Sequence, residues 1–271
     1  MSWLRTIFYA LLSGFTEFLP VSSRAHQLLF AKISGMDGSM PILNLFVHLS
    51  ELIAVIVCSG PLLNRLRRGQ DNRRRPGIRR LHMIDYDSKL IKTAILPMII
   101  LLALSFTSVS KGGLVSLSIT SVIGGGFILI AEHMRHANKD SRYMSGLDGI
   151  ALGIFSGLSF LPGISRNGAA ISYAVARGAD RKHAINWAIL LSIPALIILI
   201  ISDFIMIFAG GAESITFVVI IQYLLAGGCA FMAGYGGIQM LRFLTKRVDF
   251  SGFAYYTLGI ALLSLFVYLI A

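Results

Sequence analysis

Six largely apolar runs, each about as long as a membrane-spanning helix, constrain the fold of this chain most. They cover residues 42–60, 90–109, 115–132, 184–208, 215–241 and 252–271. Because the hydrocarbon core of a bilayer is about 30 Å thick, a spanning helix needs about 20 predominantly apolar residues. Charged residues make up only 14% of the 271, whereas soluble domains carry about 25%. The sequence therefore predicts an all-α integral membrane protein and excludes soluble, disordered and disulfide-rich folds.

Two further apolar segments, 3–34 and 147–176, are each broken by polar residues and a proline. The first contains Ser13-Gly14-Phe15-Thr16-Glu17-Phe18-Leu19-Pro20-Val21-Ser22-Ser23-Arg24, and the second contains Ser156-Gly157-Leu158-Ser159-Phe160-Leu161-Pro162-Gly163-Ile164-Ser165-Arg166. With one gap opposite Glu17, the Ser-Gly, Phe-Leu-Pro and Ser-Arg groups of the two stretches align. Each segment also precedes three of the apolar runs. We interpret this pattern as an internal duplication, with halves 1–140 and 141–271 inside one membrane domain.

The formal net charge of +11 comes from 24 Lys and Arg against 13 Asp and Glu. Most of the basic residues lie in or beside the breaks between apolar runs, at 61–89, 133–146, 177–183 and 242–249. This distribution is typical of cytoplasmic loops. We therefore attribute the charge to membrane topology, with anionic lipid headgroups as partners, and expect no nucleic acid partner.

The basic segments also predict the orientation of the two broken segments. If the basic segments are cytoplasmic, segment 147–176 begins and ends on the cytoplasmic side. Segment 3–34 then begins and ends on the outer side, and Lys111 lies at an outer turn. Each half is then one re-entrant helix hairpin followed by three transmembrane helices, and the two halves are inverted. Broken helices of such repeats meet near the midplane and form the binding site.

In both broken segments a Leu-Pro pair ends one helix, and a Ser-Arg pair is expected to open the next. The N-terminus of a helix presents unpaired N–H groups and the positive end of its dipole, which suit a phosphate group. Ser22, Ser23 and Ser165 add hydroxyl groups, and Arg24 and Arg166 can bind phosphoryl oxygens in a bidentate manner. The alternative is that these serines only cap helices and the arginines only extend toward water.

Several further ionisable residues lie inside the predicted membrane region, where they are functional candidates because burying them is costly. His26 follows Ser23 by three residues, so a helix beginning near Ser22 places these side chains on one face. Such a histidine can activate a serine or attack phosphorus itself. Glu17 could hold a divalent cation or orient the histidine.

The next predicted span carries His48 and Glu51, three residues apart on one helix face. They are candidates for the same chemistry, and the alternative is a buried His–Glu pair that locks the hairpin to its neighbour. Asp203 lies near the outer end of its span, where it can simply reach water. Together the residues predict a phosphate-binding site near the midplane. An aqueous phosphate would suit a transporter, and a lipid-linked phosphate would suit an enzyme or a flippase.

Two of these motifs resemble a known family. Glu17-Phe18-Leu19-Pro20-Val21-Ser22-Ser23, with His26 three residues later, resembles the first signature of the bacterial undecaprenyl pyrophosphate phosphatases, the bacitracin-resistance family of membrane enzymes. Leu161-Pro162-Gly163-Ile164-Ser165-Arg166-Asn167-Gly168-Ala169 resembles its second signature. The stretches Leu190-Leu191-Ser192-Ile193-Pro194-Ala195 and Tyr256-Thr257-Leu258-Gly259 are also similar to family stretches. The likeness extends over essentially the whole chain.

The resemblance implies six spans, two re-entrant hairpins and a multi-pass protein of the bacterial cytoplasmic (inner) membrane. It implies hydrolysis of undecaprenyl pyrophosphate to undecaprenyl phosphate and inorganic phosphate on the outer side, which recycles the lipid carrier of cell-wall synthesis. The cofactor it implies is Mg2+ or Ca2+, and the partners are the polyprenyl pyrophosphate and membrane lipids. The oligomeric state stays open, a homo-oligomer included.

The resemblance also assigns roles to the site residues. Glu17 carries over as a metal-binding or acid/base carboxylate and Arg166 as the pyrophosphate clamp. The nucleophile and its base carry over to the group Ser22, Ser23 and His26, without a choice between serine and histidine. From the residues themselves, and not from the resemblance, we expect substrate to be bound by Arg24, Ser165, Asn167, Gly168, His48 and Glu51.

This sequence departs from the family pattern at four positions. Ser13 stands where the family usually has a second glutamate, and Arg24 where it has a small threonine. His48 and Glu51 replace a glutamine and a small residue. One hypothesis is that Glu51 restores the carboxylate missing at Ser13. The competing hypothesis, which Ser13 favours, is a non-hydrolytic transporter or flippase of polyprenyl phosphates.

Overall fold

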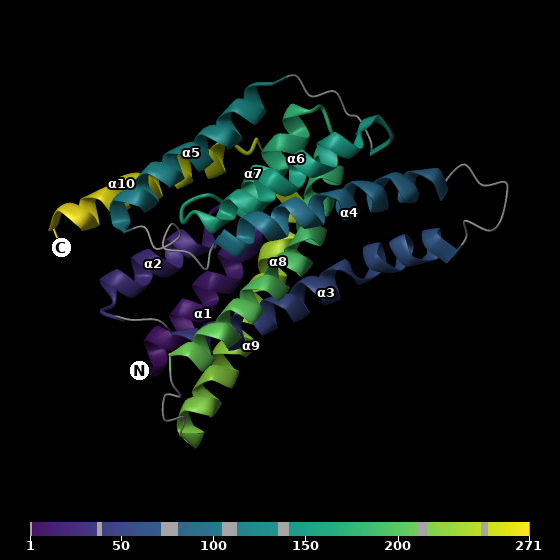
Figure 1. Ribbon diagram of the computed structural model, residues 1–271. Helices are drawn as coiled ribbons and strands as arrows, with labels where there is room; N and C mark the ends of the chain where they lie inside the picture. The colour runs from purple at the N-terminus through teal and green to yellow at the C-terminus, as the bar shows by residue number, and fades with distance from the viewer. Residues whose placement is uncertain are drawn as a thin grey trace.

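The computed structural model describes residues 2–36, 40–71, 81–104, 113–134, 141–210, 216–244 and 249–270, and the elements within these ranges are helices (Figure 1). The first half holds α1 (Trp3–Phe18), α2 (Ser23–Ile33), α3 (Pro41–Asp71), α4 (Leu81–Ala103) and α5 (Leu114–His133). The second half holds α6 (Gly146–Gly157), α7 (Arg166–Ala176), α8 (Arg181–Ala209), α9 (Phe217–Leu244) and α10 (Ser251–Ile270). Short 3-10 turns cover Ser141–Tyr143 and Leu158–Phe160.

Five helices are long and apolar enough to cross a membrane: the Pro41–Asn64 part of α3, and α5, α8, α9 and α10. They match five of the six predicted spans, so the expectation of an all-helical membrane protein is confirmed. The sixth predicted span, 90–109, falls on α4 up to Ala103, and α4 is not among the five. The first half of α4 contains charged residues, among them Lys89 and Lys92, which lower the mean hydropathy of this helix.

Parts of the predicted loops lie outside the described residues. They include residues 72–80 of the most basic segment, the outer-turn residue Lys111, and Arg135, Lys139, Lys246 and Arg247 of the smaller basic clusters.

The repeated motif acts in the same way in both halves, because it ends one helix and caps the next. Leu19, which precedes Pro20, is extended (φ −77°, ψ 161°) and follows the last residue of α1, since proline disfavours the helical conformation of the residue before it. Ser22 then caps α2, and its Oγ accepts a hydrogen bond from the Ala25 N–H. In the second half, Ser165 caps α7 by accepting from the Gly168 N–H.

The packing of the helices relates the two halves to each other. The helix α1 lies against α9, and α6 lies against α4; α5 lies against α10, as Figure 1 shows, and α3 lies against α8. If α1 to α5 are exchanged with α6 to α10 in order, the α1–α9 pair becomes the α6–α4 pair, and the α5–α10 and α3–α8 pairs are unchanged. The two halves therefore pack in an equivalent manner, each broken segment against a helix of the other half.

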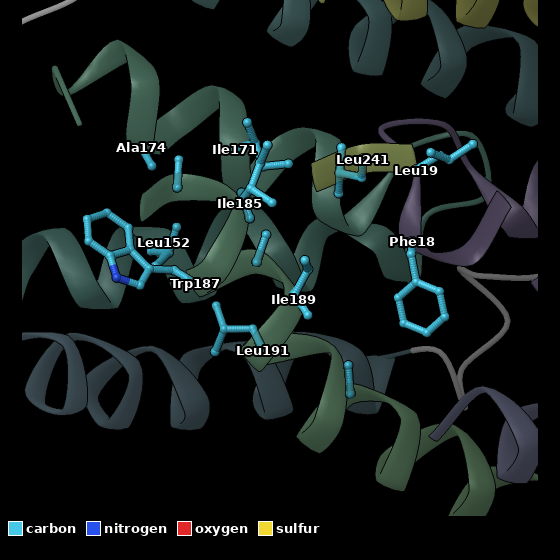
Figure 2. Packing of buried hydrophobic residues seen from close by; sticks show 14 of the residues in the cluster. Phe18, Leu19, Leu152, Ile171, Ala174, Ile185, Trp187, Ile189, Leu191 and Leu241 are labelled. Carbon is cyan, nitrogen blue, oxygen red and sulfur yellow. The ribbon is translucent and has the colours of Figure 1, made fainter. Parts of the chain in front are cut away.

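The buried core lies around α8, which is covered by helices from both halves. Ile185, Trp187, Ile189 and Leu191 of α8 are almost fully buried, together with Ile171 of α7 (Figure 2). The indole N–H of Trp187 donates to Asp87 of α4 at 2.8 Å, which gives this buried polar group a partner.

The outer helices show the reverse of the soluble pattern. In α10, the small or polar side chains of Thr257, Ala261 and Ser264 are buried. By contrast, Leu262 and Leu269 are 70% and 73% exposed. Because lipid tails are as apolar as leucine, helices in membranes pack through small residues and present large apolar ones outward. The exposed surface of α10 is therefore a lipid-facing surface.

Glycine lets the broken segments approach their partner helices closely. A Cβ atom added at Gly14 of α1 would collide with the backbone carbonyl of Ala230 on α9, and one at Gly153 of α6 would collide with that of Ala94 on α4. By contrast, no atom of the neighbouring described residues lies within 4 Å of a Cβ added at Gly228 on α9.

We expect Gly14→Ala to lower the thermal stability of the purified protein, because the added methyl group forces α1 away from α9. Overpacking of this kind costs about 1–3 kcal/mol. Thermal denaturation in detergent measures the effect, with Gly228→Ala as the matched control. An unchanged melting temperature in Gly14→Ala would contradict the close α1–α9 packing.

Candidate functional site

A polar cavity lies where the two helix breaks meet the central helices α3 and α8. Its volume is about 130 Å3, which leaves room for several water-sized groups, because a single water needs about 10–15 Å3. Its polar lining comes from both halves of the chain: Glu17, Ser22, Ser23, Arg24, Gln27, Asn44, His48, Ser159, Arg166, Ser202 and Asp203.

The two helix breaks are tied together by reciprocal hydrogen bonds. The Gly163 N–H donates to Ser22 Oγ at 3.2 Å, and Ser165 Oγ donates to the Leu19 carbonyl at 3.2 Å. Asn167 Nδ2 donates to the Phe18 carbonyl at 2.9 Å. Each break thus satisfies backbone groups of the other, which positions the N-termini of α2 and α7 beside the same cavity.

The predicted serines have different surroundings. Ser22 Oγ accepts hydrogen bonds from the N–H groups of Ala25 and Gly163, so its lone pairs are engaged and it serves as a cap, as one of the two interpretations expected. Ser23 Oγ makes a long contact of 3.5 Å with the Ser13 carbonyl. Both serines line the cavity, and the hydroxyl of Ser23 is the less engaged of the two.

Glu17 and Arg166 form a buried ion pair at the cavity. Arg166 Nη2 donates to Glu17 Oε1 at 2.6 Å, and the two side chains are 7% and 10% exposed. Arg166 Nε is buried and has no hydrogen-bond partner among the described residues. Leaving a buried donor unpaired is costly, and an anion in the cavity would remove that cost.

Arg24 brings a second guanidinium group to the cavity from the other break. Its Nη1 donates to the Phe160 carbonyl at 3.3 Å, so it crosses from α2 to the break of the second half. Both predicted arginines therefore line one cavity, beside the N-termini of α2 and α7.

Three further residues of the second signature, which were predicted to bind substrate, hold the helix breaks in place. These residues are Ser165, Asn167 and Gly168, and none of them is among the residues that line the cavity. Besides its bond to the first break, Asn167 accepts a hydrogen bond from Ser192 Oγ at 3.2 Å. In this structure these residues contact protein groups.

Glu51 lies against Ser13, the position where the sequence lacks the family carboxylate. Ser13 Oγ donates to Glu51 Oε1 at 2.8 Å, and Gln27 Nε2 donates to Ser13 Oγ at 2.6 Å. Glu51 is fully buried, and its Oε2 atom has no partner among the described residues. Glu51 is not in the cavity lining, but Gln27 is, so the carboxylate is connected to the cavity through two side chains.

His48 pairs with Asp203 and not with Glu51. His48 Nδ1 lies 2.6 Å from Asp203 Oδ2, and both residues line the cavity. The expectation that Asp203 simply reaches water is wrong, because it is 3% exposed. The helix α8 continues to Ala209, which keeps Asp203 inside the bundle.

His26 lies outside the cavity lining and has other partners. Its Nδ1 is 2.6 Å from the Ser22 carbonyl, its Nε2 is 2.8 Å from the Tyr256 hydroxyl, and the His26 and Tyr256 rings stack. Ser23 and His26 share a face of α2 as predicted, but the structure gives no hydrogen bond between His26 and the hydroxyl of either Ser22 or Ser23 among the described residues.

The sequence interpretation missed Asp203, Gln27 and Asn44 as lining residues. A signal existed for two of them. Asp203 is an acidic residue inside an apolar run, which marks a functional candidate. Gln27 follows Ser23 by four residues, which is one helical turn. Asn44 had no comparable signal.

The residues present fit a divalent cation that is held together with substrate. No group of three or more His, Cys, Asp or Glu side chains forms a ready metal cluster in the described parts of the chain. Mg2+, however, is usually bound by one or two carboxylates plus substrate phosphates. The lining charges of Arg24 and Arg166 are cancelled by those of Glu17 and Asp203, so an anionic diphosphate would gain from an additional cation.

Comparisons with known proteins identify the family. Residues 6–263 match the family described as bacitracin resistance protein BacA. Similar curated proteins include undecaprenyl-diphosphatase 3 of Bacillus cereus, which is 28% identical over 98% of this chain and 97% of its own length. The undecaprenyl-diphosphatase of Carboxydothermus hydrogenoformans is 28% identical over 98% of each chain, and that of Halothermothrix orenii is 27% identical over 94% of each. The predicted resemblance is confirmed, and this chain belongs to the bacitracin resistance protein BacA family.

Proposed function

We propose that this membrane protein is an undecaprenyl-diphosphatase, which hydrolyses undecaprenyl pyrophosphate to undecaprenyl phosphate and inorganic phosphate. The observation that carries the proposal is the buried Arg166 Nε, which has no hydrogen-bond partner in the described part of the chain and lies at a cavity that two helix N-termini approach. The named relatives, which align over nearly their whole length, support the same substrate.

In this proposal the diphosphate lies between the two helix breaks. Arg166 and Arg24 hold phosphoryl oxygens, and the N-termini of α2 and α7 add favourable dipoles. The nucleophile gives up its proton and forms a bond to the terminal phosphorus, the bridging P–O bond breaks, and the lipid phosphate leaves. Water then breaks the bond between the nucleophile and phosphorus, which releases inorganic phosphate and restores the nucleophile. Fixed positive groups that stabilise the developing charge supply most of the acceleration.

The attacking group comes from the set Ser22, Ser23 and His26. Within it, the Ser23 hydroxyl lines the cavity and is the least engaged in other hydrogen bonds. Ser22 and His26 support the turn and the start of α2 through their contacts with backbone groups.

We further propose Mg2+ or Ca2+ as cofactor, held by Glu17 together with substrate phosphate. The cation supplies positive charge to the phosphoryl group. Glu17 would exchange part of its contact with Arg166 for this role, which leaves the arginine to the phosphate.

The finer architecture that we propose is an inverted repeat with two re-entrant hairpins and a site that opens toward the outer side of the inner membrane. The start of α6 and the end of α7 lie together, because Arg177 Nε and the Tyr173 hydroxyl donate to Asp148 at 2.6 and 3.0 Å. The equivalent packing of the two halves supports the repeat as well.

Phosphate release tests the function. Purified protein is expected to release inorganic phosphate from undecaprenyl or farnesyl pyrophosphate, to stop when EDTA removes divalent cations, and to resume with added Mg2+ or Ca2+. Arg166→Ala should lower kcat/KM by about 100-fold or more, as loss of a donor to the reacting phosphoryl group does.

Arg181→Ala is the matched control, because Arg181 pairs with Glu132 at 2.7 Å outside the cavity lining. Activity retained in Arg166→Ala would show that the clamp is placed wrongly. Lipid transport without phosphate release would favour the flippase instead.

A separate experiment tests Glu51. We propose that Glu51 replaces the family carboxylate missing at Ser13, since the two side chains are hydrogen-bonded at 2.8 Å. Glu51→Gln should then abolish phosphate release as completely as Glu17→Gln. Glu132→Gln, a carboxylate outside the cavity lining, is the control. Near-normal turnover in Glu51→Gln would reject the replacement.

Labelling of single cysteines tests the topology in cells, after Cys58 and Cys229 are replaced by alanine. A membrane-impermeant maleimide should label Ser2→Cys and Ser34→Cys from outside. It should label Tyr143→Cys and Lys182→Cys only after lysis. The re-entrant arrangement would be overturned if Ser2→Cys and Ser34→Cys, or Tyr143→Cys and Lys182→Cys, were labelled from opposite sides of the membrane.

A further inference from the structure

The His48–Asp203 pair joins the two halves of the chain inside the cavity. His48 is on α3 and Asp203 is on α8, 155 positions later, and the atoms Nδ1 and Oδ2 are 2.6 Å apart. Both residues are buried, with 8% and 3% exposure. They line the same cavity as Arg24, Arg166 and Glu17, so the pair lies where the phosphate is proposed to bind.

The geometry of the pair determines what the imidazole can do. A histidine whose Nδ1 faces a carboxylate carries a proton on that nitrogen, and its ring orientation is fixed. The remaining nitrogen, Nε2, is then the polar atom that can reach a group in the cavity. In His26, by contrast, both ring nitrogens have protein partners in this structure.

The charges around His48 favour an anion as the group it meets. The ionisable residues that line the cavity with it are Arg24 on α2, Arg166 on α7, Glu17 on α1 and Asp203 on α8, and Glu51 lies one turn further along α3. With a neutral imidazole, the charges of the four lining residues cancel. With a further proton on Nε2, the five residues carry a net charge of +1, and the imidazole offers the cavity an N–H donor.

We propose that His48 donates a hydrogen bond from Nε2 to a non-bridging oxygen of the bound diphosphate, and that Asp203 is the positioning residue that holds the imidazole for this contact. The inference rests on the proposed function; it gives His48, already expected to bind substrate, a specific role and adds Asp203 to the site. It differs from a purely structural role, in which the pair would only clamp α3 to α8.

A double-mutant cycle separates these roles. Asp203→Asn removes the negative charge beside the imidazole ring, and His48→Ala removes the hydrogen-bond donor. Each should lower kcat/KM by about tenfold or more, which is the effect of losing the supporting partner of an active-site histidine. In His48→Gln, the side-chain amide can donate to phosphate without help from a carboxylate. This variant should keep most activity, and Asp203→Asn should have no further effect in the His48→Gln background.

Asp180→Asn is the matched control. Asp180 and His183 form a similar pair at 3.2 Å on partly exposed side chains, outside the cavity lining, so the variant should behave as the wild-type protein does. The melting temperature of each variant reports on the fold independently.

Two results would overturn the proposal. One is an equal loss in Asp203→Asn with and without His48→Gln, which would show that Asp203 acts on the packing of α3 and α8. The other is unchanged kcat/KM in both Asp203→Asn and His48→Ala.

If the proposed function itself is wrong, the wild-type protein releases no phosphate in this assay. In that case calorimetric binding of inorganic pyrophosphate replaces turnover as the readout. Asp203→Asn should weaken this binding in the wild-type background and not in the His48→Gln background. Equal affinity in wild-type and Asp203→Asn protein would overturn the role of the pair.

Discussion

The hydrogen bonds between the two helix breaks are the constraint on which the site depends. Inside a membrane, a helix that is broken by proline exposes backbone groups that water cannot satisfy, at a cost of several kcal/mol each. Here the break after α1 and the break before α7 satisfy one another, through Ser22 with Gly163 and Ser165 with Leu19. Neither break has these partners alone, so each half depends on the other to satisfy these backbone groups. The same bonds bring two helix N-termini to one cavity.

The electrostatics of the site follow from this arrangement. Arg166 at the start of α7 is buried, and it depends on Glu17, at the end of α1, for its charge partner. Breaking a buried pair by removing one partner is strongly destabilising, whereas exchange of one anion for another is not. In the proposed function, a phosphate that displaces part of the Glu17 contact would leave Arg166 paired and would free the carboxylate for a cation. Folding and the proposed substrate binding would thus use the same buried charge.

The sequence predicted those parts of the site that are encoded locally. The Leu-Pro and Ser-Arg motifs specify helix ends within a few residues, so the caps at Ser22 and Ser165 and the two arginines at the cavity could be expected. The partners of His48 and His26 could not, because Asp203 and Tyr256 lie 155 and 230 positions away. Helical spacing predicts which side chains share a face, as it did for Ser23 and His26. It does not predict which neighbouring helix that face contacts.

Glu51 illustrates why the position of a charge in space is a stronger constraint than its position in the chain. A carboxylate on α1 at position 13 would project toward α3, because Ser13 Oγ already reaches Glu51 Oε1 at 2.8 Å. A carboxylate on α3 at position 51 therefore projects into the same space from the opposite side. Two acidic side chains at both positions would repel each other in this buried environment. The small serine at 13 thus leaves room for the glutamate at 51, and Gln27, which donates to that serine, connects the Glu51 carboxylate to the cavity.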